Sequence, residues 1–412
     1  MGQASPFDPL SIGPLKLRNR FVKSATNEGM AKQGIVTKGL AHFHEQMAAG
    51  GVGLSTVAYC AVSPDGRTFV DQVTLNRESV PDLKALVDGI HRHGAAASAQ
   101  ITHGGCFTFL PKTLCEEPRP LSASGGFNKV GVMSNRFWKK AMDRDDMDKI
   151  ASEFVRGAEL AREAGFDAVE IHMGHGYLLS QYLSPFYNKR SDEYGGNIAK
   201  RVRFPNEVLA RVLDAVGKDL AVIVKYSMTD GASGGNTIED GIAIAKSIEA
   251  TGAHMAVLSN GLNIESITAM FGNSFPKENR GKPANPIIAL GMWLQSFTEP
   301  KNVEFHPRYL RDNALTIRDA VNMPLCYLGG VTSLADAQEA VDDGFDAIAM
   351  GRILIHDPDI INQFREGATL KSGCTSCNRC VTMMYTPGGT SCVLTHKTGD
   401  ADLNKIHARD AA

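Results

Sequence analysis

Residues 168–177 read Ala-Val-Glu-Ile-His-Met-Gly-His-Gly-Tyr, a short apolar run that gives way to histidine, glycine and tyrosine. Runs of this length, rich in Val and Ile and bounded by glycine, are typical of strands buried on both faces of a parallel sheet. Seven further runs of the same kind occur along the chain. Together they give eight predicted strands, at residues 20–25, 54–60, 95–101, 168–172, 220–226, 255–259, 324–329 and 347–351.

Segments with helical spacing lie between most of these strands. Thr237-Ile-Glu-Asp240 and Ser333-Leu-Ala-Asp336 have the form of capping boxes, which begin helices, and Gly252 is placed to end one. Strands that alternate with helices predict an α/β fold with a parallel sheet, and eight of them predict closure into a (β/α)8 TIM barrel. An open doubly wound sheet is the alternative, but no Gly-x-Gly-x-x-Gly motif follows the first strand.

The chain has 412 residues, a length that a single barrel with long loops accommodates. We predict a barrel over residues 1–370 and a cysteine-containing extension over residues 371–412 that packs on it. The intervals 106–140 and 262–307 are too long for one helix, and each follows a strand. We expect both to be long βα loops on the C-terminal face, where barrel active sites lie. The part of the second loop that contains Trp293, residues 264–306, suits either a substrate lid or a subunit contact.

Composition argues against several classes of protein. The formal net charge is only −2, which speaks against nucleic acid or an anionic membrane as a partner. No stretch approaches the roughly 20 apolar residues of a spanning helix, and the first residues lack the apolar core of a secretory signal. We therefore expect a cytoplasmic protein; the sequence leaves a homo-oligomer open.

Two histidines, His172 and His175, lie three residues apart where the fourth strand ends, so they should point into the mouth of the barrel. Three interpretations are open. A metal site needs a third ligand, and none is obvious nearby in the sequence. The pair can also consist of buried histidines with ordinary hydrogen bonds. In the third interpretation, the two rings donate to a developing oxyanion and Tyr177 delivers a proton across the site.

The residues that follow favour the third interpretation. Residues 176–196, Gly-Tyr-Leu-Leu-Ser-Gln-Tyr-Leu-Ser-Pro-Phe-Tyr-Asn-Lys-Arg-Ser-Asp-Glu-Tyr-Gly-Gly, strongly resemble the signature of the old yellow enzyme family, and the resemblance extends from Phe7-Asp-Pro-Leu to about Phe364. It implies an FMN-binding barrel that takes a hydride from NAD(P)H and passes it to the β-carbon of an activated alkene. It also implies that His172 and His175 bind the carbonyl oxygen of the substrate and that Tyr177 protonates the α-carbon.

The resemblance further implies FMN contacts at the ends of other strands. Gln100 would hydrogen-bond the pyrimidine edge of the flavin, where donors and acceptors alternate and suit a carboxamide. Glycines after the last two strands would bring backbone N–H groups close to the FMN phosphate. The full set of expected cofactor-binding residues is Ser24, Ala25, Thr26, Asn27, Tyr59, Gln100, Lys225, Gly329, Gly330, Gly351 and Arg352.

Two of these positions depart from the pattern of many family members. Asn27 stands where many relatives carry a threonine or cysteine that tunes the redox potential through a contact to the flavin ring. Lys225 stands where many carry an arginine beside N1 and O2 of the flavin. Either cation can stabilise a reduced, anionic flavin, although lysine lacks the planar fork of a guanidinium.

Four of the eight cysteines, Cys374, Cys377, Cys380 and Cys392, follow the last predicted helix of the barrel. Their spacing suits a [4Fe–4S] cluster or, less well, zinc. It resembles the iron–sulfur segment of trimethylamine dehydrogenase and 2,4-dienoyl-CoA reductase, where the cluster relays electrons between FMN and partners. In the second of these relatives the electrons come from a further domain, and about 20 residues after Cys392 do not hold one. Free thiols that cap the barrel are therefore the alternative.

We accordingly expect an NAD(P)H-dependent ene-reductase that acts on α,β-unsaturated carbonyl compounds. The first alternative is an enzyme of the dienoyl-CoA-reductase or amine-dehydrogenase type, which exchanges electrons with a separate partner through the cysteine cluster. A tRNA dihydrouridine synthase shares the FMN barrel but needs a basic surface. A flavin- or metal-binding module without turnover would have no need of His172, His175 and Tyr177 together.

Overall fold

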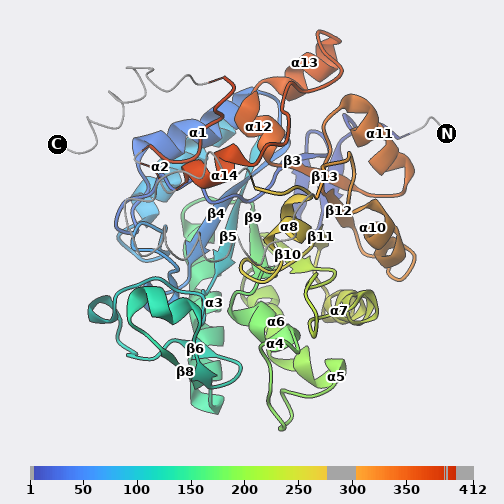
Figure 1. Ribbon diagram of the computed structural model, residues 1–412. Helices are drawn as coiled ribbons and strands as arrows, with labels where there is room; N and C mark the ends of the chain where they lie inside the picture. Colours follow the sequence, from blue (N-terminus) through green and yellow to red (C-terminus); the bar gives the residue numbers. More distant parts are fainter. Residues whose placement is uncertain (1–3, 276–302, 385, 387, 396–412) are drawn as a thin grey trace.

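The computed structural model describes residues 4–384, except 276–302, together with residues 386 and 388–395. Eight strands, each parallel to both of its neighbours, close into a barrel at the centre of the molecule (Figure 1). The prediction of a (β/α)8 TIM barrel is therefore confirmed, and all eight predicted strands are present with bounds shifted by a few residues at most. In chain order they are β3 (Phe21–Lys23), β4 (Leu54–Ala61), β5 (Ala96–Thr102), β9 (Ala168–Met173), β10 (Ala221–Ser227), β11 (Met255–Ser259), β12 (Leu325–Leu328) and β13 (Ala347–Met350).

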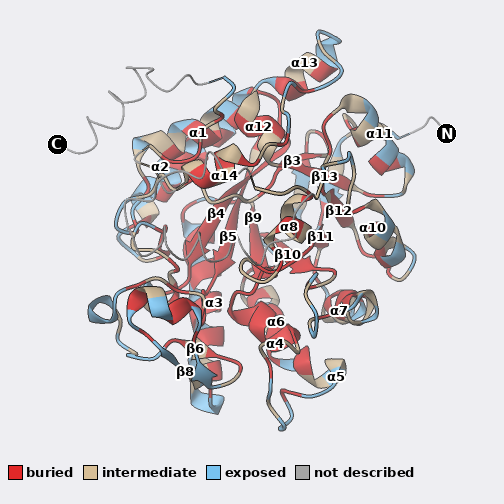
Figure 2. Ribbon diagram, viewed as in Figure 1, coloured by how far each residue is buried: buried red, intermediate tan, exposed pale blue. Residues whose placement is uncertain are grey.

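Helices surround the barrel, and their inward faces form its main core with the outward-facing strand residues (Figure 2). Both expected capping boxes are present, at Thr237–Asp240 and Ser333–Asp336, and Gly252 ends its helix in the left-handed conformation with φ 98°. The longer helices are α1 (Lys38–Ala49), α2 (Val80–His91), α3 (Arg144–Glu163), α6 (Arg203–Val216), α7 (Ile238–Thr251), α10 (Arg311–Arg318), α11 (Leu334–Asp342) and α13 (Ile360–Glu366). The shorter ones are α4 (Leu178–Leu183), α5 (Ile198–Arg201), α8 (Ile267–Phe271), α12 (Arg352–His356) and α14 (Arg379–Met383).

A hairpin of β1 (Leu10–Ile12) and β2 (Leu15–Leu17) closes the N-terminal end of the barrel. Its buried side chains Ile12 and Leu17 form a separate apolar cluster with residues at the beginnings of the barrel strands, such as Leu54 and Met255. Because this end is filled with side chains, only the C-terminal end is open for a ligand.

The two long intervals differ in what they contain. Residues 106–140, expected as a loop, hold a small three-stranded sheet of β6 (Leu121–Ser122), β7 (Gly126–Phe127) and β8 (Trp138–Ala141). Residues 262–307 begin with α8 above the barrel mouth, and most of the remainder, including Trp293, lies outside the described residues. The expectation of a lid or subunit contact there stays a prediction.

The segment after α13 returns to the barrel mouth and packs beside the first strand. Thr390 donates from its backbone N–H to Glu28 O and from its hydroxyl to Asn27 O at 3.0 Å. Gly29 has no room for a Cβ, because the backbone of Met384 would occupy its place. Across the described residues, no helix combines the length and apolar character that crossing a bilayer requires.

Candidate active site

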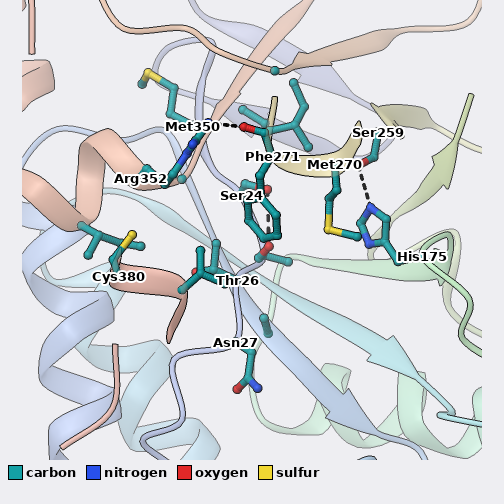
Figure 3. A pocket seen from close by; sticks show the side chains of 18 of the residues that line it. Ser24, Thr26, Asn27, His175, Ser259, Met270, Phe271, Met350, Arg352 and Cys380 are labelled. Atoms are coloured by element: carbon teal, nitrogen blue, oxygen red, sulfur yellow. Dashed lines mark hydrogen bonds between the residues drawn. The ribbon is translucent and has the colours of Figure 1, made fainter. Parts of the chain in front are cut away.

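A cavity of about 240 Å³ opens at the C-terminal ends of the barrel strands, and it brings together side chains that are far apart in the sequence. All of the residues predicted to be catalytic or to bind the cofactor line it. Figure 3 shows Arg352 and Cys380 on one side of the cavity and His175 and Ser259 on the other. The geometry therefore agrees with one shared site, although the role of each residue stays a prediction.

The two histidines form a connected chain at the end of β9. The backbone N–H of Gly174 donates to Nδ1 of His172 at 3.2 Å, so the neutral ring carries its proton on Nε2. That Nε2 lies 3.3 Å from Nδ1 of His175, whose Nε2 lies 2.7 Å from the hydroxyl of Ser259. His175 has φ 62°, a left-handed conformation that is uncommon for residues other than glycine but that histidine adopts more often than most. Its backbone N–H donates to Ser227 Oγ at 3.2 Å, which helps to hold it there.

Both rings are neutral donors at physiological pH. Burial holds the pKa of His172 well below its usual value, and the nearby His175 and Lys225 lower it further. Burial likewise holds the pKa of His175 well below its usual value, with Lys225 as the second cause. A neutral imidazole can donate one hydrogen bond to an oxygen without carrying a charge of its own. The arrangement is therefore suited to polarising a carbonyl group rather than to forming an ion pair.

Tyr177 comes directly after the histidine turn and is buried. Its ring lies 4.7 Å from the His172 ring and 5.4 Å from the Tyr59 ring, measured between centroids, and Phe107 packs edge-on against it. Burial raises the pKa of Tyr177, while hydrogen bonding to the side chains of Tyr59 and Asn263 lowers it. The hydroxyl is therefore a protonated group beside the histidine pair, as a proton donor must be.

The floor of the cavity carries polar groups from β5, β9 and β10. Gln100 donates from Nε2 to Glu170 Oε1 at 2.6 Å, which fixes the orientation of the amide. Lys225 donates from Nζ to Ser24 Oγ at 3.1 Å. Burial lowers the pKa of Lys225, and the charge of Glu170 raises it. An amide, a hydroxyl and a cation side by side form a donor set that fits the pyrimidine edge of a flavin.

The segment 24–27 crosses the cavity above β3, and hydrogen bonds hold it. Ser24 N donates to Met350 O at 2.8 Å, and the Thr26 hydroxyl donates to Glu28 at 2.8 Å. Glu28 forms a buried ion pair with Lys23. Asn27, the expected tuning residue, accepts at Oδ1 from Gly29 N at 3.1 Å, and its side chain points away from the other labelled groups (Figure 3). The role of Asn27 in tuning the redox potential of the flavin stays a prediction.

The glycines predicted to cradle a phosphate follow β12 and β13. Gly329 and Gly330 have φ 133° and 79°, backbone angles that residues with a Cβ rarely adopt. Arg352 does not stand free beside them: its guanidinium donates to Phe271 O at 2.9 Å, to Ser376 O at 3.2 Å and to Asn378 Oδ1 at 2.5 Å. Arg352 thus ties the C-terminal segment to the rim of the cavity.

The four predicted metal-binding cysteines lie in one region of the C-terminal segment, where Cys380 is within electrostatic range of the other three. No group of three or more His, Cys, Asp or Glu side chains among the described residues has an arrangement that could hold a metal ion. Cys392 Sγ instead lies 3.3 Å from His356 Nδ1, and Cys374 Sγ accepts from Ser376 N at 3.4 Å. Burial raises the pKa of Cys380, which lines the cavity, to about 12. The assignment of these four thiols to an iron–sulfur cluster therefore stays a prediction.

Three residues of the site were missed from the sequence. Ser259 ends a predicted strand, and its position at the C-terminal end of a barrel strand was a signal that could have identified it. Glu170 precedes the histidines on the same strand and was overlooked beside them. Asn263 lies in the segment after β11, and the sequence contains no pattern that would single it out.

A model of the NADH:flavin oxidoreductase / NADH oxidase family matches residues 5–293. The chain is 36% identical to the 4,4'-dithiodibutanoate disulfide reductase of Rhodococcus erythropolis over 396 residues, 95% of each chain. It is 30% identical to the NADH oxidase of Thermoanaerobacter brockii over 373 residues, but this match covers 89% of the chain and only 52% of that relative. The solved structure of the old yellow enzyme homologue from Zymomonas mobilis matches with a TM-score of 0.69 at 22% identity, covering 91% and 96% of the two chains.

Proposed function

The chain belongs to the NADH:flavin oxidoreductase / NADH oxidase family and is an NAD(P)H-dependent, FMN-using oxidoreductase, and we propose that it reduces the activated C=C bond of α,β-unsaturated carbonyl compounds. One observation carries this proposal. His172, His175 and Tyr177 converge on one cavity as two neutral imidazoles and a protonated phenol. Reduction of an enone needs these two functions, polarisation of the carbonyl and protonation of a carbon.

Bound FMN would supply the hydride that NAD(P)H provides. Gln100, Lys225 and Ser24 would hold its polar edge, because they form the donor set on the cavity floor. The glycines at 329–330 would place the backbone close to its phosphate. These assignments follow from the geometry and from the resemblance of the sequence to the family.

The histidine pair can bind a carbonyl oxygen after a small change in hydrogen bonding. His172 already carries its proton on the nitrogen that faces His175. For His175 to donate from Nδ1 as well, its Nε2 must become an acceptor, and the Ser259 hydroxyl can donate to it because a hydroxyl serves in either role. We therefore assign Ser259 the task of permitting both rings to donate to one oxygen.

A second candidate is reduction of an organic disulfide. The name of the Rhodococcus erythropolis relative, a 4,4'-dithiodibutanoate disulfide reductase, favours this substrate class. A disulfide that accepts two electrons leaves as two thiolates, or as thiols with pKa near 8.5, so its cleavage requires no protonation at carbon. The two substrate classes consequently make different demands on Tyr177.

Tyr177→Phe separates the candidates. We expect reduction of cyclohexenone by the dithionite-reduced enzyme to slow about 10²-fold or more, because the general acid is lost. Reduction of 4,4'-dithiodibutanoate should stay within about threefold. Tyr182→Phe is the matched control, because Tyr182 is fully buried, packs against Phe204 and does not line the cavity. If Tyr177→Phe reduces the enone at the wild-type rate, the proposed role of Tyr177 is wrong.

A further inference from the structure

A second tyrosine, Tyr59, stands beside Tyr177 at the end of β4 and belongs to a chain of hydroxyl and amide groups. Its hydroxyl lies 2.6 Å from Oγ1 of Thr68. The Thr68 hydroxyl donates to Gln72 Oε1 at 3.0 Å, and the Thr68 backbone N–H donates to the same oxygen. Gln72 in turn donates from Nε2 to the carbonyl oxygen of Tyr59 at 3.0 Å. Tyr59, Thr68 and Gln72 are buried, so water cannot easily substitute for any of these bonds.

This chain fixes the direction of each hydrogen. A backbone carbonyl only accepts, so the amide of Gln72 must present its nitrogen to Tyr59 O and its oxygen to Thr68. The amide oxygen only accepts, so the single hydroxyl hydrogen of Thr68 points to Gln72. Thr68 Oγ1 can then approach Tyr59 only as an acceptor. The hydroxyl hydrogen of Tyr59 is therefore directed to Thr68, and its oxygen can accept a hydrogen bond from Tyr177.

We propose that Tyr59 is a positioning residue that acts through Tyr177, because its one hydroxyl hydrogen has two alternative acceptors: Thr68 Oγ1 while Tyr177 is protonated, and the Tyr177 oxygen once Tyr177 is a phenolate. This role rests on the proposed function, in which Tyr177 is the proton donor. Tyr59 would accept from Tyr177 until the Tyr177 hydrogen turns toward the α-carbon, and it would donate to the Tyr177 oxygen after the transfer. The ring contact of 5.4 Å between the two centroids keeps the side chains together through the change.

The step balances without any further group. The O–H bond of Tyr177 breaks, and its proton forms a C–H bond at the α-carbon, using the electron pair that the enolate placed there. The phenolate left on Tyr177 keeps the bonding pair of its former O–H. Tyr59 turns its hydrogen toward that charge, and Thr68 Oγ1 gives up one accepted bond. Hydrogen bonds to a charged group are stronger than neutral ones, so the exchange favours the phenolate.

Two substitutions with opposite expected effects test this role. Tyr59→Phe keeps the ring and removes the hydrogen, so cyclohexenone reduction by dithionite-reduced enzyme should slow about tenfold to a hundredfold. Thr68→Val removes the resting acceptor and leaves the Tyr59 hydrogen permanently available to Tyr177, so the rate should stay within about threefold of the wild type or rise. Reduction of the bound FMN by NADPH needs no proton from Tyr177 and should be unchanged in Thr68→Val, whose altered residue does not line the cavity.

A measurement apart from turnover follows the phenol itself. In protein carrying tyrosine labelled with ¹³C at Cζ, the Tyr177 signal is identified by its absence from Tyr177→Phe, and its titration is followed from about pH 8 to about pH 12. We expect the pKa of Tyr177 to rise in Tyr59→Phe and to fall in Thr68→Val. A packing role for Tyr59 would not move the two variants in opposite directions.

The outcomes separate this inference from the proposed function. An unchanged Tyr177 titration and enone rate in Tyr59→Phe would overturn the role of Tyr59, and so would a rise of the pKa in both variants. An unchanged enone rate in Tyr177→Phe would overturn the proposed function and the catalytic use of Tyr59. In that case the titration would still report whether the hydrogen bond exists.

Discussion

The two sides of the cavity carry equally distinctive sequence patterns, yet the structure treats them differently. On one side, His172, His175 and Tyr177 converge, and the His172 ring contacts both of the other rings. On the other side, the C-terminal segment contributes Cys380 to the lining of the cavity, and among the described residues no group of three or more His, Cys, Asp or Glu side chains has an arrangement that could hold a metal ion. The histidines are fixed by backbone and side-chain hydrogen bonds at the end of a barrel strand. The difference teaches that the fold alone forms the histidine site, whereas the cysteine segment presents candidate ligands without a described metal-binding arrangement.

The largest effect should come from the histidine side. In His172→Ala, the ring donor to the carbonyl oxygen is lost, and enone reduction by dithionite-reduced enzyme should slow about 10²- to 10³-fold. The flavin absorption of the purified protein should persist, because His172 is not among the groups expected to hold FMN. The rate is measured in single turnovers by stopped flow.

A substitution on the cysteine side provides the comparison for that experiment. Cys377→Ser, assayed in the same way, should stay close to the wild-type rate. A His172→Ala enzyme that reduces the enone as fast as Cys377→Ser would remove the functional distinction between the two sides.

Much of the histidine side could be predicted because its signals are local. The strand β9 is a short apolar run, and a side chain at the end of a barrel strand must face the mouth. Its supporting contacts could not be predicted in the same way. Ser259 reaches His175 from β11, and Thr68 reaches Tyr59 across a loop. These contacts depend on how the closed barrel brings distant segments together.

Two features could not be predicted from local sequence patterns: the small sheet in residues 106–140 and the geometry of the C-terminal cysteines. The sequence predicts a loop where the structure has the small sheet of β6, β7 and β8, because these strands are two to four residues long and partly exposed. Such strands do not show the apolar runs that identified the barrel. For the cysteines, a spacing typical of iron–sulfur proteins specifies candidate ligands but not their geometry. Here Cys392 lies against His356, and Cys374 accepts from the backbone of Ser376.

The pH dependence of stability should also distinguish the two sides. The pKa of His172 and of His175 in the folded protein lies well below the ordinary value near 6.5, because both rings are buried. Below about pH 6.5 the unfolded chain binds protons that the folded chain does not, so stability falls as the pH falls. Each ring can contribute up to about 1.4 kcal/mol per pH unit to that slope.

The measurement is urea unfolding at several pH values between about 5 and about 8, a range centred on the ordinary histidine pKa. The variant His172→Asn should show a shallower loss of stability toward acid than the wild type. Cys374 and Cys380 should add nothing in this range, because burial raises the pKa of each and both stay thiols. Equal acid sensitivity in the wild type and His172→Asn would contradict the neutral state of the His172 ring.

The smallest effect is expected from the cysteines that do not line the cavity. In Cys377→Ser and Cys392→Ser, a thiol becomes a hydroxyl of similar shape. The described residues contain no preformed metal site that either substitution would remove. Stability should change by about 1 kcal/mol or less in Cys377→Ser. Stability should change somewhat more in Cys392→Ser, where the contact of 3.3 Å with His356 is altered.

Iron and zinc contents, determined by elemental analysis of anaerobically purified protein, should be far below one atom per chain in the wild type and both variants. About four iron atoms per wild-type chain, lost in both variants, would show that these thiols bind a [4Fe–4S] cluster and rearrange to do so. The cysteines would then form a second functional site. The two sites would differ only in when they form: the histidine site forms when the chain folds, and the cysteine site forms only when the metal binds.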